Sequence, residues 1–136
     1  MAKTRIGSNA IFTGVGPSSF TTIGNRCYAY SGYKIFSNSE TTVLDFYTPK
    51  GYILSTWQYS IMDDGETINE DDSRIRIYFN GTKVFVQVDS GDPDRVQNAW
   101  PDLIIPPLTR VKVTVENVTD ASNLATYVYM VGRVYS

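Results

Sequence analysis

The chain contains no histidine, and this absence removes several kinds of active site at once. Ser-His-Asp and Cys-His nucleophile systems both need an imidazole, as do histidine general bases and histidine-ligated zinc centres. Any catalytic site would have to work without that group. We therefore predict that the protein is not an enzyme and that it uses no cofactor.

Cysteine is almost as scarce, because Cys27 is the one example in 136 residues. One cysteine cannot form an internal disulfide, and the strand-like sequence around Cys27 indicates a small buried hydrophobe. The first residues run into polar, Gly- and Ser-rich sequence without the apolar segment of a signal peptide, and no apolar run is long enough to cross a membrane. We expect a chain that is made in a host cytoplasm, is not secreted by a signal peptide and has no membrane partner.

A basic stripe is also missing from the sequence. The 12 Lys and Arg residues are scattered singly among 14 Asp and Glu residues, which gives a net charge of −2. Proteins that bind nucleic acid neutralise its phosphates with clustered cations. We therefore expect no nucleic-acid partner.

Alanine and leucine, which helices prefer, are few, whereas Val, Ile, Tyr and Phe are common. Strand-like runs follow one another with turn residues between them, and no segment keeps a helical period for two turns. The predicted strands are residues 27–36, 42–47, 52–62, 74–79, 83–89, 103–105, 110–118 and 125–135.

This pattern predicts an all-β fold, an antiparallel two-sheet β-sandwich of jelly-roll-like type. The Cys…Trp…Cys framework of immunoglobulin domains is missing, and long strands near both ends of the chain suit a jelly roll better. We expect one β-sandwich domain over residues 26–136. An extended N-terminal arm over residues 1–25, rich in Gly, Ser, Thr and Asn, would precede it.

One hairpin allows a prediction of register. Asn80-Gly81 is a strong signal for a two-residue type I′ turn. The residue pairs that follow from it are Phe79 with Thr82, Tyr78 with Lys83, Ile77 with Val84, Arg76 with Phe85, Ile75 with Val86 and Arg74 with Gln87. In this register Val84 and Val86 face the core together with Ile75 and Ile77.

Two predicted strands, residues 52–62 and 125–135, are apolar on both faces. In the second of them Tyr127 and Tyr129 alternate with Val128 and Met130. A strand that faces solvent on one side normally alternates between apolar and polar residues. We therefore expect another part of the chain or another subunit to cover the outer face of these strands.

Two acidic segments could hold an ion or act as paired carboxylates. The first is Asp63-Asp64-Gly65-Glu66 with Glu70-Asp71-Asp72, which lacks the residue order of a calcium loop and is best interpreted as a solvated loop. The second offers a Ca²⁺ site made of Asp89, Asp92 and Asp94, although Asp, Ser, Gly and Pro are also ordinary turn residues. We favour the turn.

Aromatic residues suggest another kind of site. Ten Tyr and two Trp in a β-sandwich could form a platform for sugars, as in carbohydrate-binding modules. Tyrosine is also a good strand residue, with its ring in the core and its hydroxyl at the surface. The sequence leaves both interpretations open.

Three segments resemble the small jelly-roll virion proteins of tailed bacteriophages. They are residues 42–53, residues 105–113, which contain Pro106-Pro107 before a long strand, and residues 128–135, which end the chain inside its last strand. The resemblance covers about the last two-thirds of the chain. It implies a capsid decoration, or cement, protein that sits on the outside of a head and ties major capsid subunits together.

The leading hypothesis is therefore a structural component of the virion, whose partners are the major capsid protein and further copies of itself, as in a homotrimer. The expected contact residues are the apolar positions of the arm and the outward tyrosines of the last strand: Ile6, Ile11, Phe12, Phe20, Tyr127 and Tyr129. The alternative is a carbohydrate-binding or receptor-binding module. An enzyme that uses Glu66 and Glu70 ranks last.

Overall fold

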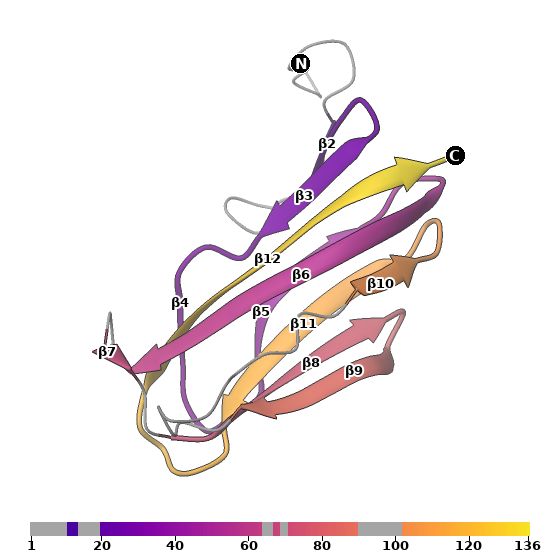
Figure 1. The fold of residues 1–136 in the computed structure, drawn as a ribbon. Helices are drawn as coiled ribbons and strands as arrows, with labels where there is room; N and C mark the ends of the chain where they lie inside the picture. The colour runs from indigo at the N-terminus through magenta and orange to yellow at the C-terminus, as the bar shows by residue number, and fades with distance from the viewer. Residues whose placement is uncertain (1–10, 14–19, 64–66, 69–70, 90–101) are drawn as a thin grey trace.

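Strands alone make up the regular structure in the computed structural model, which describes residues 11–13, 20–63, 67–68, 71–89 and 102–136. They form two antiparallel sheets that pack face to face as a sandwich (Figure 1). The predicted all-β sandwich is thus confirmed. None of these residues lies in a helix, so this part of the chain holds no helix that could cross a membrane.

The larger sheet has eight strands in the order β1-β2-β3-β12-β6-β10, with β4 paired to β12 and β7 paired to β6. Its strands are β1 (Ile11–Thr13), β2 (Phe20–Ile23), β3 (Arg26–Tyr30), β4 (Lys34–Phe36), β6 (Tyr52–Asp63), β7 (Thr67–Ile68), β10 (Asp102–Ile105) and β12 (Leu124–Tyr135).

The smaller sheet has four strands in the order β5-β11-β8-β9. They are β5 (Thr41–Tyr47), β8 (Ser73–Phe79), β9 (Thr82–Asp89) and β11 (Arg110–Asn117).

The strand pairs are nested along the chain. β3 pairs with β12, β5 with β11, β6 with β10, and β8 with β9. A long antiparallel ribbon with β8 and β9 at its tip gives this order when it is rolled so that successive pairs fall alternately in the two sheets. This is the jelly-roll arrangement that the sequence predicted.

The core lies between the sheets because each strand turns alternate side chains inward. Its largest fully buried side chains include Trp57 of β6, Phe20 of β2 and Phe46 of β5. Phe20 and Phe46 come from different sheets and stack with their ring centroids 5.0 Å apart. The Trp57 indole donates to Ser55 Oγ at 2.9 Å, and that hydroxyl donates to the Leu103 carbonyl at 2.7 Å, so the buried polar groups are paired.

Cys27 belongs to the same core and is 3% exposed. Burial raises the pKa of its thiol to about 11. The cysteine is therefore a packing residue, as the sequence predicted.

The β8–β9 hairpin differs from the predicted register. Phe79 lies opposite Thr82 and Tyr78 opposite Lys83, as expected, but Ile77 lies opposite Phe85 instead of Val84. A β-bulge at this point adds one residue to β9 and reverses the face of everything after it. The prediction that Val84 and Val86 face the core is therefore wrong. Phe85 packs against the core in their place, since it is the larger apolar side chain.

The predicted N-terminal arm also needs correction. Its end falls within the β2–β3 hairpin, because residues 20–23 pair with β3 from Phe20 opposite Ala29 to Ile23 opposite Arg26. Phe20 was predicted to be a contact residue, but it is 1% exposed and lies in the core. A phenylalanine on an inward position of a sheet strand gains more from burial than from exposure.

The predicted strand 27–36 is interrupted. Ser31 breaks it into β3 and β4, with its backbone N–H donating to the Val128 carbonyl and its hydroxyl accepting from the Val128 N–H, both at 2.9 Å. Gly32 follows with a positive φ of 72°. The serine side chain thus replaces a backbone acceptor where the chain turns out of the sheet.

Gly132 marks the tightest place between the two longest strands. A Cβ at this position would lie 2.6 Å from the Leu54 carbonyl oxygen and 2.9 Å from Ile53 Cγ2. The backbone oxygen belongs to β6 and cannot move without disturbing the sheet. β12 therefore needs glycine at this position for a steric reason.

We predict that Gly132→Ala lowers the free energy of unfolding by about 1–3 kcal/mol, the usual cost of overpacking. Val131→Ala, at the next residue but on the exposed face, should change it by less than about 0.5 kcal/mol. Urea unfolding followed by tryptophan fluorescence measures both. Equal effects of the two variants would contradict the steric argument.

Candidate interaction surface

The outer face of the larger sheet is unusually apolar. On β3, β12, β6 and β10 the inward side chains form the core, so the alternate ones point outward. Seven large apolar side chains on this face are between 41% and 61% exposed: Tyr30, Tyr52, Leu54, Ile104, Tyr127, Val131 and Tyr135. We call this surface the aromatic face.

Four tyrosines form one end of the aromatic face. Tyr28 and Tyr30 stack with their ring centroids 5.0 Å apart and their planes 30° apart. Tyr30 meets Tyr129 edge to face at 5.9 Å, since the two residues are directly opposite on β3 and β12. Tyr127 and Tyr129 lie with centroids 6.4 Å apart. The rings support one another, which lowers the entropy that each loses when a partner binds.

Aliphatic residues extend the aromatic face toward the edge of the sheet. Val131 lies opposite Tyr28 on one side and Thr56 on the other. Leu54 lies opposite Ile104 of β10, and Tyr52 lies opposite Tyr135. Apolar side chains thus occur on the outer face of all four strands, with Thr56, Gln58 and Ser60 of β6 as polar outward residues among them.

The total exposed area of the aromatic face indicates whether it is a contact surface. An aromatic side chain carries about 200 Å² of surface. Four tyrosines of the face are 41–55% exposed and together leave about 400 Å² in water: Tyr30, Tyr52, Tyr127 and Tyr135. That area already matches the largest apolar patch of a typical monomer, about 300–600 Å², before Leu54, Ile104 and Val131 are added. Patches of this size mark contact surfaces in soluble proteins.

Two arginines lie side by side on the aromatic face. Arg26 of β3 and Arg133 of β12 are directly opposite each other, and both are exposed. Arg133 lies between Val131 and Tyr135 along β12 and opposite Leu54 of β6. Neither arginine forms an ion pair with a residue that the structure describes. Like charges in opposite positions destabilise a sheet, so an acidic group of a partner would relieve this repulsion.

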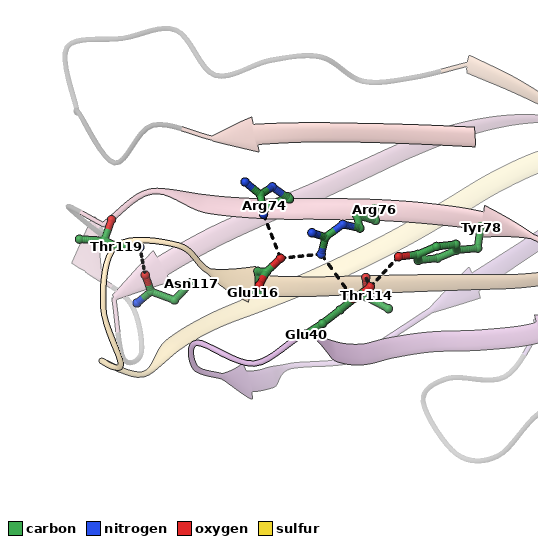
Figure 2. A network of polar contacts seen from close by, with 8 residues as sticks. All are labelled: Glu40, Arg74, Arg76, Tyr78, Thr114, Glu116, Asn117 and Thr119. Atoms are coloured by element: carbon green, nitrogen blue, oxygen red, sulfur yellow. Dashed lines mark hydrogen bonds and ion pairs between the residues drawn. The ribbon is translucent and has the colours of Figure 1, made fainter. Parts of the chain in front are cut away.

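The outer face of the smaller sheet carries ion pairs between β8, β11 and the residue before β5 (Figure 2). Glu116 of β11 accepts from Arg74 at 3.2 Å and pairs with Arg76. Arg76 also reaches Glu40 at 3.5 Å. Glu40 lies before β5 and accepts hydrogen bonds from the Tyr78 hydroxyl at 2.7 Å and the Thr114 hydroxyl at 2.6 Å.

These two hydroxyl donors hold the pKa of Glu40 below its usual range, with Thr114 the larger cause. At the end of the same sheet Arg110 forms a two-pronged ion pair with Asp45, at 3.0 and 2.7 Å, and lies over the Tyr47 ring at 5.8 Å. The outer face of the smaller sheet therefore has ion pairs over β5, β8 and β11 and exposed valines along β9, whereas the larger sheet exposes large apolar side chains on β3, β12, β6 and β10.

The calcium hypothesis finds little support at Asp89. This carboxylate is 8% exposed and accepts hydrogen bonds through Oδ1 from the Tyr59 hydroxyl at 3.1 Å and the Gln87 amide at 2.9 Å. Burial raises its pKa. Asp92 and Asp94 lie outside the described residues. Among the residues that are described, no group of three acidic or cysteine side chains is arranged to hold a metal ion.

Two residues of the other acidic segment, Asp71 and Asp72, make hydrogen bonds that hold a loop in place. Asp71 accepts from the Asn117 amide at 3.0 Å, and the Asp72 backbone N–H donates to the Thr119 hydroxyl at 2.8 Å. Asn117 in turn accepts from the Thr119 N–H at 2.9 Å (Figure 2). Glu66 and Glu70 lie outside the described residues.

The predicted contact residues lie in different parts of the structure. Tyr127 and Tyr129 lie on the aromatic face, whereas Phe20 lies in the core. Ile6 lies outside the described residues, and of Ile11 and Phe12 the structure places only the backbone, in β1.

The sequence prediction missed several residues of the aromatic face, above all Tyr28 and Tyr30. The signal was present, because small Cys27 and Ala29 alternate with these tyrosines as inward residues alternate with outward ones. The strand that contains Ile104 has four residues, which is too short for the alternation to show that Ile104 points outward.

We predict that Glu40→Gln destabilises the fold at pH 7 by less than about 1 kcal/mol, because its side chain is 40% exposed. A carboxyl whose folded pKa is lowered stabilises the protein above its unfolded pKa, about 4.3, and loses this contribution as the pH falls through the folded pKa. The difference in melting temperature between wild type and variant should therefore shrink from pH 7 to pH 2. A constant difference would contradict the assignment.

Asp89→Asn should have the opposite pH dependence. A carboxyl whose folded pKa is raised destabilises the fold above that pKa, and this cost disappears below the unfolded pKa, about 3.9. Asparagine keeps an oxygen that can accept from Tyr59 and Gln87. We expect the variant to have a urea midpoint equal to or above that of wild type at pH 7.5, with any advantage lost at pH 3.5. A lower midpoint at pH 7.5 would show that the charge itself is needed.

Comparison with protein-family models, with curated proteins and with solved structures gave no match to this chain. The aromatic face, together with Arg26 and Arg133, is accordingly the candidate functional site on the strength of its geometry.

Proposed function

We propose that the protein is a structural component of a virion, a capsid decoration protein that uses its aromatic face to bind major capsid subunits. The observation that carries the proposal is the contrast between the two outer faces. One exposes about 400 Å² of aromatic surface, whereas the other has ion pairs over β5, β8 and β11 and exposes smaller valines along β9.

A protein that coats a shell needs this asymmetry. One face must be apolar enough to stay on the shell, and the opposite face must remain hydrated so that coated particles do not adhere to one another. The paired strands β6 and β12 provide a stiff base for the contact residues, so little order is gained on binding.

The charges of the aromatic face indicate the chemistry of the partner. Arg26 and Arg133 lie side by side without a described counter-charge. A capsid surface with acidic side chains opposite them would convert a repulsion into two ion pairs within an apolar contact. Neighbouring copies bound to one shell could then also associate with one another.

Carbohydrate binding is the second candidate, because Tyr28, Tyr30, Tyr127 and Tyr129 form an aromatic cluster. Sugars stack on the open faces of aromatic rings. In this cluster the faces of Tyr28 and Tyr30 are turned toward each other at 5.0 Å, and Tyr30 meets Tyr129 edge to face. Rings that cover one another offer fewer open faces, and this favours a protein partner.

Substitution of the aromatic face tests the proposal. Tyr30→Ser and Tyr127→Ser should each weaken binding to purified, undecorated phage heads about 30-fold or more, the effect of losing about 2 kcal/mol at an aromatic hot spot. Tyr47→Ser is the matched control, since Tyr47 is a 59% exposed tyrosine on the smaller sheet. Co-sedimentation with heads gives the affinities, and circular dichroism confirms that each variant folds.

Absence of binding to heads, in a protein that light scattering shows to be monomeric, would exclude the decoration role. A glycan array with reproducible hits that Tyr30→Ser abolishes would replace it with the carbohydrate-binding function. Loss of head binding in Tyr47→Ser alone would place the contact on the other sheet.

A further inference from the structure

The smaller sheet ends in an open edge at β9. This strand pairs with β8 on one side, and among the strands that the structure describes none pairs with its other side (Figure 1). Such an edge presents a row of backbone donors and acceptors that a further strand can use. Proteins usually protect an open edge with charged side chains, proline, a β-bulge or a very short strand. β9 has its bulge near one end, next to Lys83.

The other sheet edges for which side chains are described carry such protection, and β9 carries little. β5, at the opposite edge of the smaller sheet, has Asp45 in an ion pair with Arg110. β10, at the edge of the larger sheet, has four residues and is followed by Pro106. β9 has eight residues, and between Lys83 and Asp89 it has no charged side chain.

The side chains of β9 add an apolar stripe to the open edge. Val84, Val86 and Val88 are 41%, 49% and 50% exposed. They point outward because of the β-bulge after Lys83, which turns Phe85 to the core instead. Valine is common in strands and rare at exposed positions, so three in a row along an edge call for a physical explanation.

The outward valines of β9 are arranged symmetrically about Val86. When β9 lies antiparallel to a copy of itself with Val86 at the centre, Val84 faces Val88 of the partner subunit and Val86 faces Val86 of the partner subunit. This register gives three valine pairs, a shift by two residues leaves two, and a shift by one pairs outward valines with inward residues.

From this symmetry we propose that the protein forms a homodimer in which β9 pairs antiparallel with β9 of a second copy. The two smaller sheets then become one continuous sheet of eight strands across a two-fold axis. Such an interface closes on itself, because each copy has one β9 edge and uses it once. The proposal rests on β9 alone and leaves the aromatic face free, so it is independent of the proposed function.

The first test is the mass of the full-length protein in solution. Sedimentation velocity from micromolar to millimolar concentration should show a monomer–dimer equilibrium for wild type. Val86→Lys places two like charges opposite each other on the two-fold axis and should weaken dimerisation about a hundredfold or more. Val131→Lys is the matched control: the same substitution of a 42% exposed strand valine, but on the aromatic face, should leave the dimer unchanged.

Cysteine variants test the register without adding charge. Residues opposite each other on antiparallel strands have Cα atoms about 4.5–5.5 Å apart, within the range that a disulfide spans. Val86→Cys should therefore cross-link to itself on mild oxidation. Val84→Cys and Val88→Cys should cross-link readily when mixed, at least tenfold faster than either does alone. The wild-type protein is the blank, because Cys27 is buried.

Three results would overturn the proposal. They are a wild-type monomer at millimolar concentration, an association that Val131→Lys abolishes and Val86→Lys does not, and open-ended aggregates in place of a dimer. The second result would assign self-association to the aromatic face, and its effect on head binding would be measured separately. Val84→Cys that cross-links to itself as fast as the mixture would contradict the register.

Discussion

Twelve residues of β12 pair with β6, from Leu124 opposite Asp63 to Tyr135 opposite Tyr52 (Figure 1). Both strands lie in the interior of the larger sheet, so neither can shift register without turning its core residues outward. Trp57, Val128 and Met130 fix the inward face. The same alternation then sets Tyr127, Tyr129 and Val131 outward, and the aromatic face follows from the register that builds the core.

The two sheets differ in the side chains that their outer faces present to solvent. The smaller sheet has short charge-assisted contacts on its outer face, such as Glu40 with Thr114 and Tyr78, and its exposed valines lie along β9. The larger sheet leaves apolar side chains in water on several strands, which costs solubility unless something covers them. Exposed apolar surface of this extent is typical of a protein that works by contact.

Alternation and turn signals were enough to predict the all-β sandwich, most strands and the doubly apolar character of β6 and β12. The misses have a common cause, because each depends on a neighbour that is distant in sequence. The bulge in β9 follows from the room for Phe85 against the core, and the burial of Phe20 follows from Phe46 in the other sheet. Ser31 breaks a strand because Val128, 97 residues away, accepts and donates there.

Cys27 gives the molecule a chemical property that its fold alone would not suggest. With a pKa of about 11, its thiol is ionised in about one molecule in ten thousand at pH 7, and the thiolate is the reactive form. The chain can therefore pass from a reducing to an oxidising medium without forming mixed disulfides or sulfenic acid. Its surface behaves as that of a cysteine-free protein, so a single thiol introduced anywhere on it can be labelled without competition.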